Sequence, residues 1–211
     1  MKLRSLASLL LGMSMLPSVA LATDRPTVFD FEYTFPASPT APRVNIADYA
    51  VQWFVINVID PPTEAVTYLE FEINALSHAS PMDLRVELLD PTGDLDTPGN
   101  GIVIMDEAGW QHSISNQTLI FNDKFPAALP HGEKAGAINS GFFSQDGPGL
   151  FSNYYGSPLP EGGWYVVITD GAVGDVGSFE SVTLRGTVVP EPATLTLLAL
   201  GAVAVLRRRR A

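Results

Sequence analysis

The sequence predicts an all-β fold, an antiparallel β-sandwich, for the central part of this 211-residue chain. Several short runs alternate apolar and polar residues with a period of two, which is the pattern of half-buried strands. Glycine and proline, 18 and 17 residues in all, punctuate these runs. No segment of residues 23–187 keeps the apolar period of about 3.6 residues that marks a helix. Many short strands separated by turn residues favour two packed antiparallel sheets.

Three runs in the first half of this region are predicted strands. Residues 27–35 alternate aromatic and polar side chains, so we expect a half-buried strand there. Residues 50–59 (AVQWFVINVI) are dense in β-branched and aromatic side chains, which favours a central strand. Residues 66–73 alternate again, with predicted inward side chains Leu69, Phe71 and Ile73 and outward side chains Tyr68, Glu70 and Glu72.

The first 22 residues have the three parts of a secretory signal peptide. These parts are the basic residues Lys2 and Arg4, the apolar run 6–16 and the small cleavage-site residues Ala20 and Ala22. An uncleaved transmembrane helix is the weaker reading, because the apolar run is short and Pro17 interrupts it. We expect signal peptidase to cut after Ala22 and leave Thr23 as the mature N-terminus.

Residues 188–211 form a second signal-like segment. The triplet Pro190, Glu191 and Pro192 is followed by an apolar run, residues 193–206, and by a basic cluster, Arg207, Arg208, Arg209 and Arg210. The prolines favour an end to the folded body. A helix over the apolar run would be roughly 21 Å long, short of the ~30 Å hydrocarbon core of a bilayer. The arginines would stay on the cytoplasmic side, with the body outside.

This triplet, apolar run and basic end resemble the PEP-CTERM sorting signal of Gram-negative bacteria. The resemblance implies that an exosortase in the inner membrane recognises the triplet and removes the tail. It also implies an exported protein that is transiently held in that membrane and then works at the cell surface or outside the cell, often with exopolysaccharide. The alternative is an ordinary C-terminal anchor that is never cut.

The body between the two signals, residues 23–187, has the length of one domain. The signals hold half of the twelve basic residues but only one of the twenty-three acids, so the body has six basic and twenty-two acidic residues, a net charge of −16. Such a surface argues against nucleic acid and anionic lipid as partners. The chain contains no cysteine, which excludes disulfides, thiol catalysis and thiolate metal sites.

A run of motifs in the second half resembles the P domain (P/Homo B domain) of proprotein convertases and bacterial subtilisin-like proteases. The resemblance covers residues 69–187, and its motifs are 83–93, 118–123, 141–143, 163–170 and 174–184. It implies a jelly-roll-like sandwich that is not itself catalytic and can bind calcium. Val182 stands where the family has a tryptophan, and the loop after Asp123 is long. Residues 23–68 are too few for a protease domain.

No residue pattern predicts a catalytic site. His78, His112 and His131 lie in loop-like contexts without metal-ligand spacing, and no serine lies in a Gly-x-Ser-x-Gly elbow. A pair of converging carboxylates, as in glycoside hydrolysis, is left open by the sequence. We therefore expect the protein not to be an enzyme.

Calcium is the ligand that the acidic turns favour, because hard cations bind several oxygen ligands. One candidate is the Gly/Pro-rich loop with Asp94 and Asp96, and the other groups Asp123 with Asp170 and Asp175. The alternative is that these aspartates are solvated turn residues. The loop does not match an EF-hand.

The sequence thus predicts an exported, non-catalytic β-sandwich with a structural or interaction role. One form of this prediction adds stabilisation of the fold by calcium. Its expected partners are signal peptidase and exosortase during processing, then exopolysaccharide or a secreted protein. One alternative is a carbohydrate-binding module, for which the available aromatic side chains are Trp53, Trp110, Tyr154 and Tyr155. Another is an accessory domain of a secreted serine peptidase.

Overall fold

A computed structural model describes residues 25–36, 42–93, 101–133 and 136–189. The predicted signal peptide, the sorting tail with its apolar helix, and Asp94 and Asp96 lie outside the described residues. Two 3-10 helices, η1 (Pro81–Asp83) and η2 (Phe151–Tyr154), join the strands. The strands are β1 (Phe31–Phe35), β2 (Val44–Ile46), β3 (Val51–Val58), β4 (Val66–His78), β5 (Leu84–Leu89), β6 (Ile102–Asp106), β7 (Ile114–Phe121), β8 (Gly141–Phe143), β9 (Gly162–Asp170), β10 (Gly177–Phe179) and β11 (Ser181–Val188).

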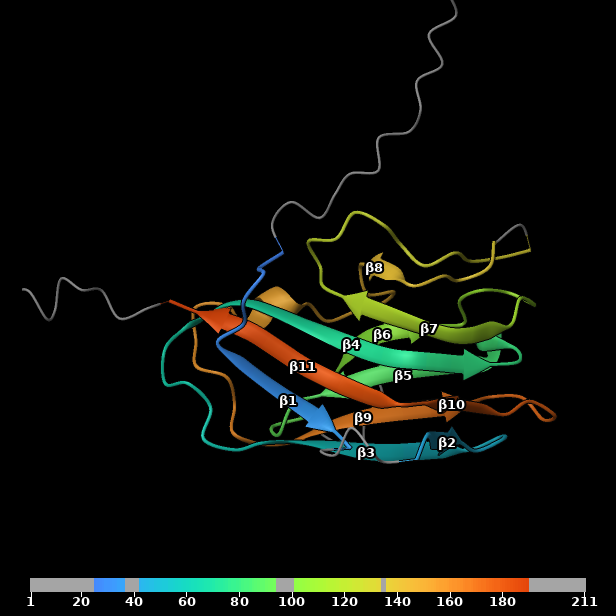
Figure 1. Ribbon diagram of the computed structural model, residues 1–211, viewed down its shortest axis with the longest axis horizontal. Helices are drawn as coiled ribbons and strands as arrows, with labels where there is room; N and C mark the ends of the chain where they lie inside the picture. The colour runs from blue at the N-terminus through green and yellow to red at the C-terminus, as the bar shows by residue number, and fades with distance from the viewer. Residues whose placement is uncertain (1–24, 37–41, 94–100, 134–135, 190–211) are drawn as a thin grey trace, which may run out of the picture.

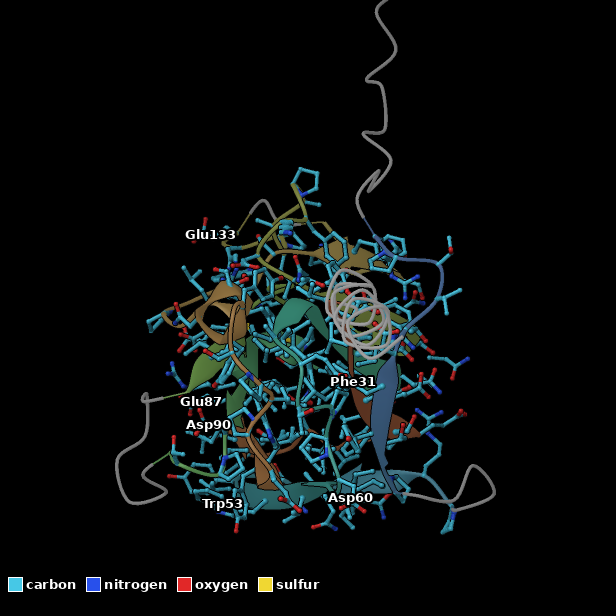
Figure 2. The ribbon with its side chains drawn as sticks, turned by 90° about the vertical axis from the view of Figure 1, so that its left-hand side faces the viewer. Phe31, Trp53, Asp60, Glu87, Asp90 and Glu133 are labelled. Atoms are coloured by element: carbon cyan, nitrogen blue, oxygen red, sulfur yellow. The ribbon has the colours of Figure 1, made fainter. Side chains whose placement is uncertain are left out.

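The strands form two sheets that pack face to face, so the predicted jelly-roll-like antiparallel sandwich is confirmed. The larger sheet has seven strands, with the path β1-β11-β4-β10-β2 and with β7 and β8 on the other side of β4. The smaller sheet has the order β3-β9-β5-β6. All pairs are antiparallel except β7 with β8, which are parallel. Figure 1 shows β11 and β4 in front of β9 and β5, and Figure 2 shows side chains filling the space between the layers.

β4 is the central strand of the larger sheet. Phe71 pairs with Leu184 of β11 on one edge and with Phe121 of β7 on the other. The predicted inward side chains Leu69, Phe71 and Ile73 are all fully buried. The prediction for the opposite face is wrong for Tyr68 and Glu70, which are also buried. They are covered by the segment before β1, whose contacts are described below.

The dense run at residues 50–59 becomes an edge strand, so the prediction of a central strand is wrong. In the described residues β3 pairs only with β9, over eight consecutive residues without a bulge. Phe54, Ile56 and Val58 face the core, whereas Val51 and Trp53 on the other face are 55% and 43% exposed. The run is apolar on both faces although only one face is buried by the second sheet.

The core between the sheets is built on large aromatic side chains. Trp164, Phe71, Phe121, Phe151 and Phe179 are fully buried. The Trp164 indole N–H donates to the Pro160 carbonyl at 3.0 Å, which satisfies its polar atom. Val182, at the position where the resembling family has a tryptophan, is also fully buried and pairs with Ile73.

The last strand is tied to the fold up to its final residue. The backbone N–H of Val188 donates to the Asp30 carboxylate at 2.9 Å. The next N–H, that of Val189, donates to the Ala65 carbonyl, also at 2.9 Å. Hydrogen bonds to the body therefore extend to Val189, the last residue that the structure describes. In the part of the chain that the structure describes, no helix is long and apolar enough to cross a membrane.

Replacing Phe71 by alanine should lower the free energy of unfolding by about 3–5 kcal/mol, because it leaves a cavity where the central strand packs on the core. Urea unfolding followed by circular dichroism measures this loss. The control is Val173→Ala at a side chain that is 75% exposed, for which we expect a change within about 0.5 kcal/mol. Equal effects of the two substitutions would contradict this packing.

Candidate functional site

The structure places Asp123 far from Asp170, so these two members of the predicted calcium group do not come together. Next to Asp123, the Asn122 amide donates to the Leu69 carbonyl near the start of β4. Asp170 contacts His78, the last residue of the same strand. Nine residues of extended strand separate these points by roughly 30 Å. Among the described residues, no group of three or more His, Asp or Glu side chains is placed to hold a metal ion.

Asp123 and Asp170 each have a local contact instead. The Asp123 carboxylate accepts the Ser152 N–H at 3.2 Å, and the Asp170 carboxylate accepts the Ala172 N–H at 3.2 Å. Asp175 is half-buried in the turn before β10. Asp90, at the start of the predicted calcium loop, accepts two hydrogen bonds from Thr92 and one from the Tyr154 hydroxyl. Its carboxylate therefore closes its own turn.

A buried histidine–aspartate pair is present that the sequence analysis did not find. His78 Nε2 lies 3.2 Å from Asp170 Oδ2, and both side chains are fully buried. His78 Nδ1 accepts the Ser80 N–H at 3.2 Å, so the ring proton lies on Nε2 and is donated to Asp170. Both ring nitrogens are thus used within the fold, and neither is available to activate a nucleophile.

The alternation of β4 could not reveal this pair because the strand contains an irregularity. Ala75 has φ = 56°, and the pairing of β4 with β7 shifts register between Ile73 and Leu76. After this point the inward positions change parity, which brings His78 into the interior. A β-bulge of this kind leaves no signal in a period-two pattern.

His131 makes the second contact between a histidine and an acid, at the surface. Its Nε2 lies 2.9 Å from Asp146 Oδ1, while Asp146 Oδ2 accepts the Asp106 N–H at 3.1 Å. Burial raises the pKa of Asp146, although the bonds from His131 and Asp106 oppose this shift. The pair joins the long loop after β7 to the edge of β6. The remaining histidine, His112, is exposed.

The buried carboxylate of Glu70 accepts hydrogen bonds from four donor atoms. Arg25 donates to it from Nε at 2.9 Å and from Nη2 at 2.7 Å, and Arg185 donates from Nε at 2.5 Å. The Tyr68 hydroxyl donates at 2.7 Å. Phe29 covers both guanidinium groups, with its ring centre 5.2 Å from Arg25 and 5.0 Å from Arg185. We name these five residues the Glu70 cluster.

The pKa of Glu70 reflects this environment. Burial alone would raise the pKa, but the hydrogen bonds from Arg25, Tyr68 and Arg185 favour the carboxylate and hold the pKa below its ordinary value. Burial and the bond to Glu70 raise the pKa of Tyr68. A carboxylate with four donors and a depressed pKa is a poor general base, so the Glu70 cluster is a structural element.

A hollow between β2 and β10 has a volume of about 570 Å³. Its lining consists of Asn45, Ile46, Ala47, Ser77, Val176, Gly177 and Ser178. None of these side chains is titratable, so the hollow supplies no acid or base of its own.

Of the four aromatic residues named for sugar binding, Trp53 alone projects from a sheet face with much of its ring exposed. Tyr154 packs on Trp164, with ring centres 5.0 Å apart, and donates its hydroxyl to Asp90. Tyr155 accepts a hydrogen bond from Asn122. Trp110 is half-buried in the turn that follows β6. Tyr154 and Tyr155 are therefore structural side chains.

Trp53 lies on the outer face of the smaller sheet, where its neighbours range from half-buried to buried, and Glu87 among them is only 4% exposed. Its ring makes an edge-to-face contact with Tyr165, with centres 6.4 Å apart and planes at 78°. Beside them, Arg85 donates to Glu87 at 3.0 Å and to Asp106 at 2.8 Å. The bond to Glu87 raises the pKa of Arg85. Trp53 and Glu87 lie on the same side of the molecule in Figure 2. These five residues are the candidate functional site.

Comparison with known proteins confirms the sorting signal. Residues 188–210 match a family described as the PEP-CTERM protein-sorting motif, so the chain carries a signal for export and for sorting by an exosortase. No curated protein matches the chain.

Two solved structures of a serine protease of Aeromonas sobria are similar to the body. The protease in complex with its chaperone has 15% identity and a TM-score of 0.29, and covers 71% of this chain. The protease alone has 13% identity and a TM-score of 0.28, and covers 72%. This chain spans 28% of the length of each.

Replacing Glu70 by glutamine should destabilise the protein by about 1–3 kcal/mol near neutral pH, because the partly buried Arg25 and Arg185 lose a charged acceptor, although Arg185 keeps its contact with Glu72. A depressed pKa also makes stability pH-dependent. The ionised Glu70 stabilises the fold above its unfolded pKa of about 4.3, and this contribution is lost as the pH falls through the lower folded pKa. Urea unfolding between pH 7 and pH 3 measures both effects.

Glu32→Gln is the matched control, because Glu32 faces the same Arg185 at 3.7 Å but is 56% exposed. We expect it to change stability by less than about 1 kcal/mol. If the Glu70→Gln protein lost stability on acidification as steeply as the unchanged protein, the role of the buried carboxylate would be refuted.

Proposed function

We propose that this protein is a non-catalytic interaction module that works outside the cell, at the cell surface or in the extracellular matrix. The observation that carries the proposal is the sorting motif at residues 188–210, which follows the last strand directly. A segment that directs export and processing supports a site of action beyond the inner membrane. The net charge of −16 on the body supports solubility there and disfavours nucleic acid.

The contacts of the buried ionisable groups support a non-catalytic role. Glu70 has its donors supplied from within the fold, and both nitrogens of His78 are hydrogen-bonded. Catalytic acids and bases need a free position facing a substrate. The candidate site on the smaller sheet has aromatic and charged side chains on an open face, an arrangement suited to binding.

Two finer versions of this proposal concern its partner and its stability. A role beside a secreted serine peptidase rests on the P-domain resemblance of residues 69–187, and co-purification with such a peptidase would support it. Calcium stabilisation rests on Asp94 and Asp96 in the acidic Gly/Pro-rich loop.

The sorting motif gives the first test of export. We expect the unchanged protein to reach the cell surface or the medium in a shortened form, and the Pro190→Ala, Glu191→Ala, Pro192→Ala protein to remain in the membrane at full length. Cell fractionation with an antibody against the body measures both. Glu161→Ala, an exposed acid outside the motif, should behave as the unchanged protein. Retention of the unchanged protein in the cytoplasm would refute the proposal.

Calcium is tested by thermal unfolding in chelator and then in millimolar calcium. At about 100 times its dissociation constant the ion should add roughly 2.7 kcal/mol, which is several degrees at this size. The Asp94→Asn, Asp96→Asn protein should lose this shift, whereas Asp60→Asn should keep it. The same melting temperature with and without calcium would remove the ion from the proposal.

A further inference from the structure

We propose that the outer face of the smaller sheet binds a neutral oligosaccharide chain, with Trp53 and Tyr165 as stacking platforms, Arg85 and Asp106 as hydrogen-bonding groups, and the buried Glu87 carboxylate holding Arg85 in place. The inference deepens the proposed function by naming the class of partner, and it rests on the protein being exported. The sequence suggested Trp110, Tyr154 and Tyr155 as companions of Trp53. In the structure the neighbours of Trp53 on this face are Tyr165, Arg85, Glu87 and Asp106.

The strand register places these side chains in adjacent rows. One row across the sheet runs Val51, Thr169, Arg85 and Asp106, and the next runs Trp53, Val167, Glu87 and Val103. The third row runs Val55, Tyr165 and Leu89. Core residues alternate with them and point to the other face, as Phe54, Trp164 and Val86 do. Val167, Glu87, Val103 and Leu89 are buried, so the accessible platform lies around Trp53, Tyr165, Arg85 and Asp106.

The two aromatic rings suit the apolar C–H faces of sugar rings. Trp53 is 43% exposed, although its neighbour Val167 is 5% exposed and fixes the base of the indole. The edge-to-face contact with Tyr165 holds both rings in one orientation. Large, rigid side chains of this kind supply binding area at a small cost in conformational entropy.

The polar half of the platform is already ordered. Arg85 bridges the carboxylates of Glu87 and Asp106, and its side chain is 34% exposed. A guanidinium has five N–H donors and a carboxylate has two acceptor oxygens, so Arg85 and the 40% exposed Asp106 side chain keep further hydrogen-bonding capacity, whereas the Glu87 side chain is 5% exposed. Sugar hydroxyls need donors and acceptors together. An ion pair held before binding lowers the entropic cost of capturing them.

Charge decides between classes of polymer. With a net charge of −16 on the body and two carboxylates on the platform, an anionic polysaccharide is repelled. A protein partner would have to desolvate Arg85, Glu87 and Asp106 to cover a small apolar area around Trp53, which is costly. A neutral sugar chain can leave these groups hydrated and exchange only single water contacts.

The test is affinity electrophoresis of the full chain in native gels that contain one soluble polysaccharide each. The neutral probes are glucomannan, xyloglucan, galactan and dextran, and the anionic probe is polygalacturonate. The detergent is lauryldimethylamine oxide, because a sugar headgroup would compete. We expect at least one neutral probe to retard the protein and polygalacturonate not to do so.

Variants then locate the site. Trp53→Ala should weaken binding about tenfold or more, the loss that is typical of an exposed aromatic anchor. Arg85→Gln should weaken it about fivefold, which corresponds to one hydrogen bond. Tyr49→Ala is the matched control, because Tyr49 is 68% exposed but lies in the turn before β3, outside the platform. Circular dichroism verifies that each variant is folded.

Three outcomes would overturn the inference. These are no retardation by any neutral probe, retardation by polygalacturonate alone, or equal loss in the Trp53→Ala and Tyr49→Ala proteins. Failure of the proposed function is a separate result, seen by fractionation as a protein that is not exported. An exported protein that binds no neutral probe would retain the proposed function and lose this site.

Discussion

The buried carboxylate of Glu70 holds together parts of the chain that are far apart in sequence. It lies on the central strand, and its donors come from Arg25 before the first strand and Arg185 in the last one. Without cysteine, the chain has no covalent link to join these regions. Three charged groups and the Tyr68 hydroxyl meet beneath the Phe29 ring. The cost of burying each charge is therefore offset by the opposite charge beside it. The cluster closes the outer face of the larger sheet, whereas that of the smaller sheet carries Trp53 and Arg85 in the open.

The two outer faces therefore differ in role. In the larger sheet, Glu70 and Tyr68 are buried on a face that a simple alternating strand would expose. In the smaller sheet, Trp53, Arg85 and Asp106 keep part of their surface accessible, whereas Glu87 beside them is buried. The outer face of the smaller sheet is thus an area where apolar and polar groups are mixed. Such a mixture suits a partner that is itself amphipathic at the scale of a few atoms.

Much of the fold could be predicted from the period of two. The alternation in residues 66–73 identified Leu69, Phe71 and Ile73 as core side chains, because inward positions of a strand differ in kind from outward ones. The same rule failed where an outward acid is neutralised by distant arginines, as at Glu70. It also failed past Ala75, where an irregular residue changes the parity. An apolar run does not show whether a strand lies at the edge or in the centre of its sheet. For this reason residues 50–59 were predicted as a central strand, whereas they form an edge strand.

The candidate site was only partly visible in the sequence. Trp53 could be named as an available aromatic, but its neighbours Tyr165 and Glu87 come from strands more than thirty residues away. Only the pairing register brings them into rows. The proposed ion ligands Asp123 and Asp170 failed for the same reason, because sequence order does not show that they lie at opposite ends of β4. The sorting signal, by contrast, is read along a continuous stretch and needs no tertiary contact.

The last strand runs to the edge of that signal without a spacer. Val188 and Val189 are both hydrogen-bonded to the body, and the Pro-Glu-Pro triplet begins at the next residue. An enzyme that recognises this triplet therefore meets a motif whose preceding residue is already hydrogen-bonded to the sandwich. The surface around Asp30 and Ala65, which anchors these final residues, lies next to that motif.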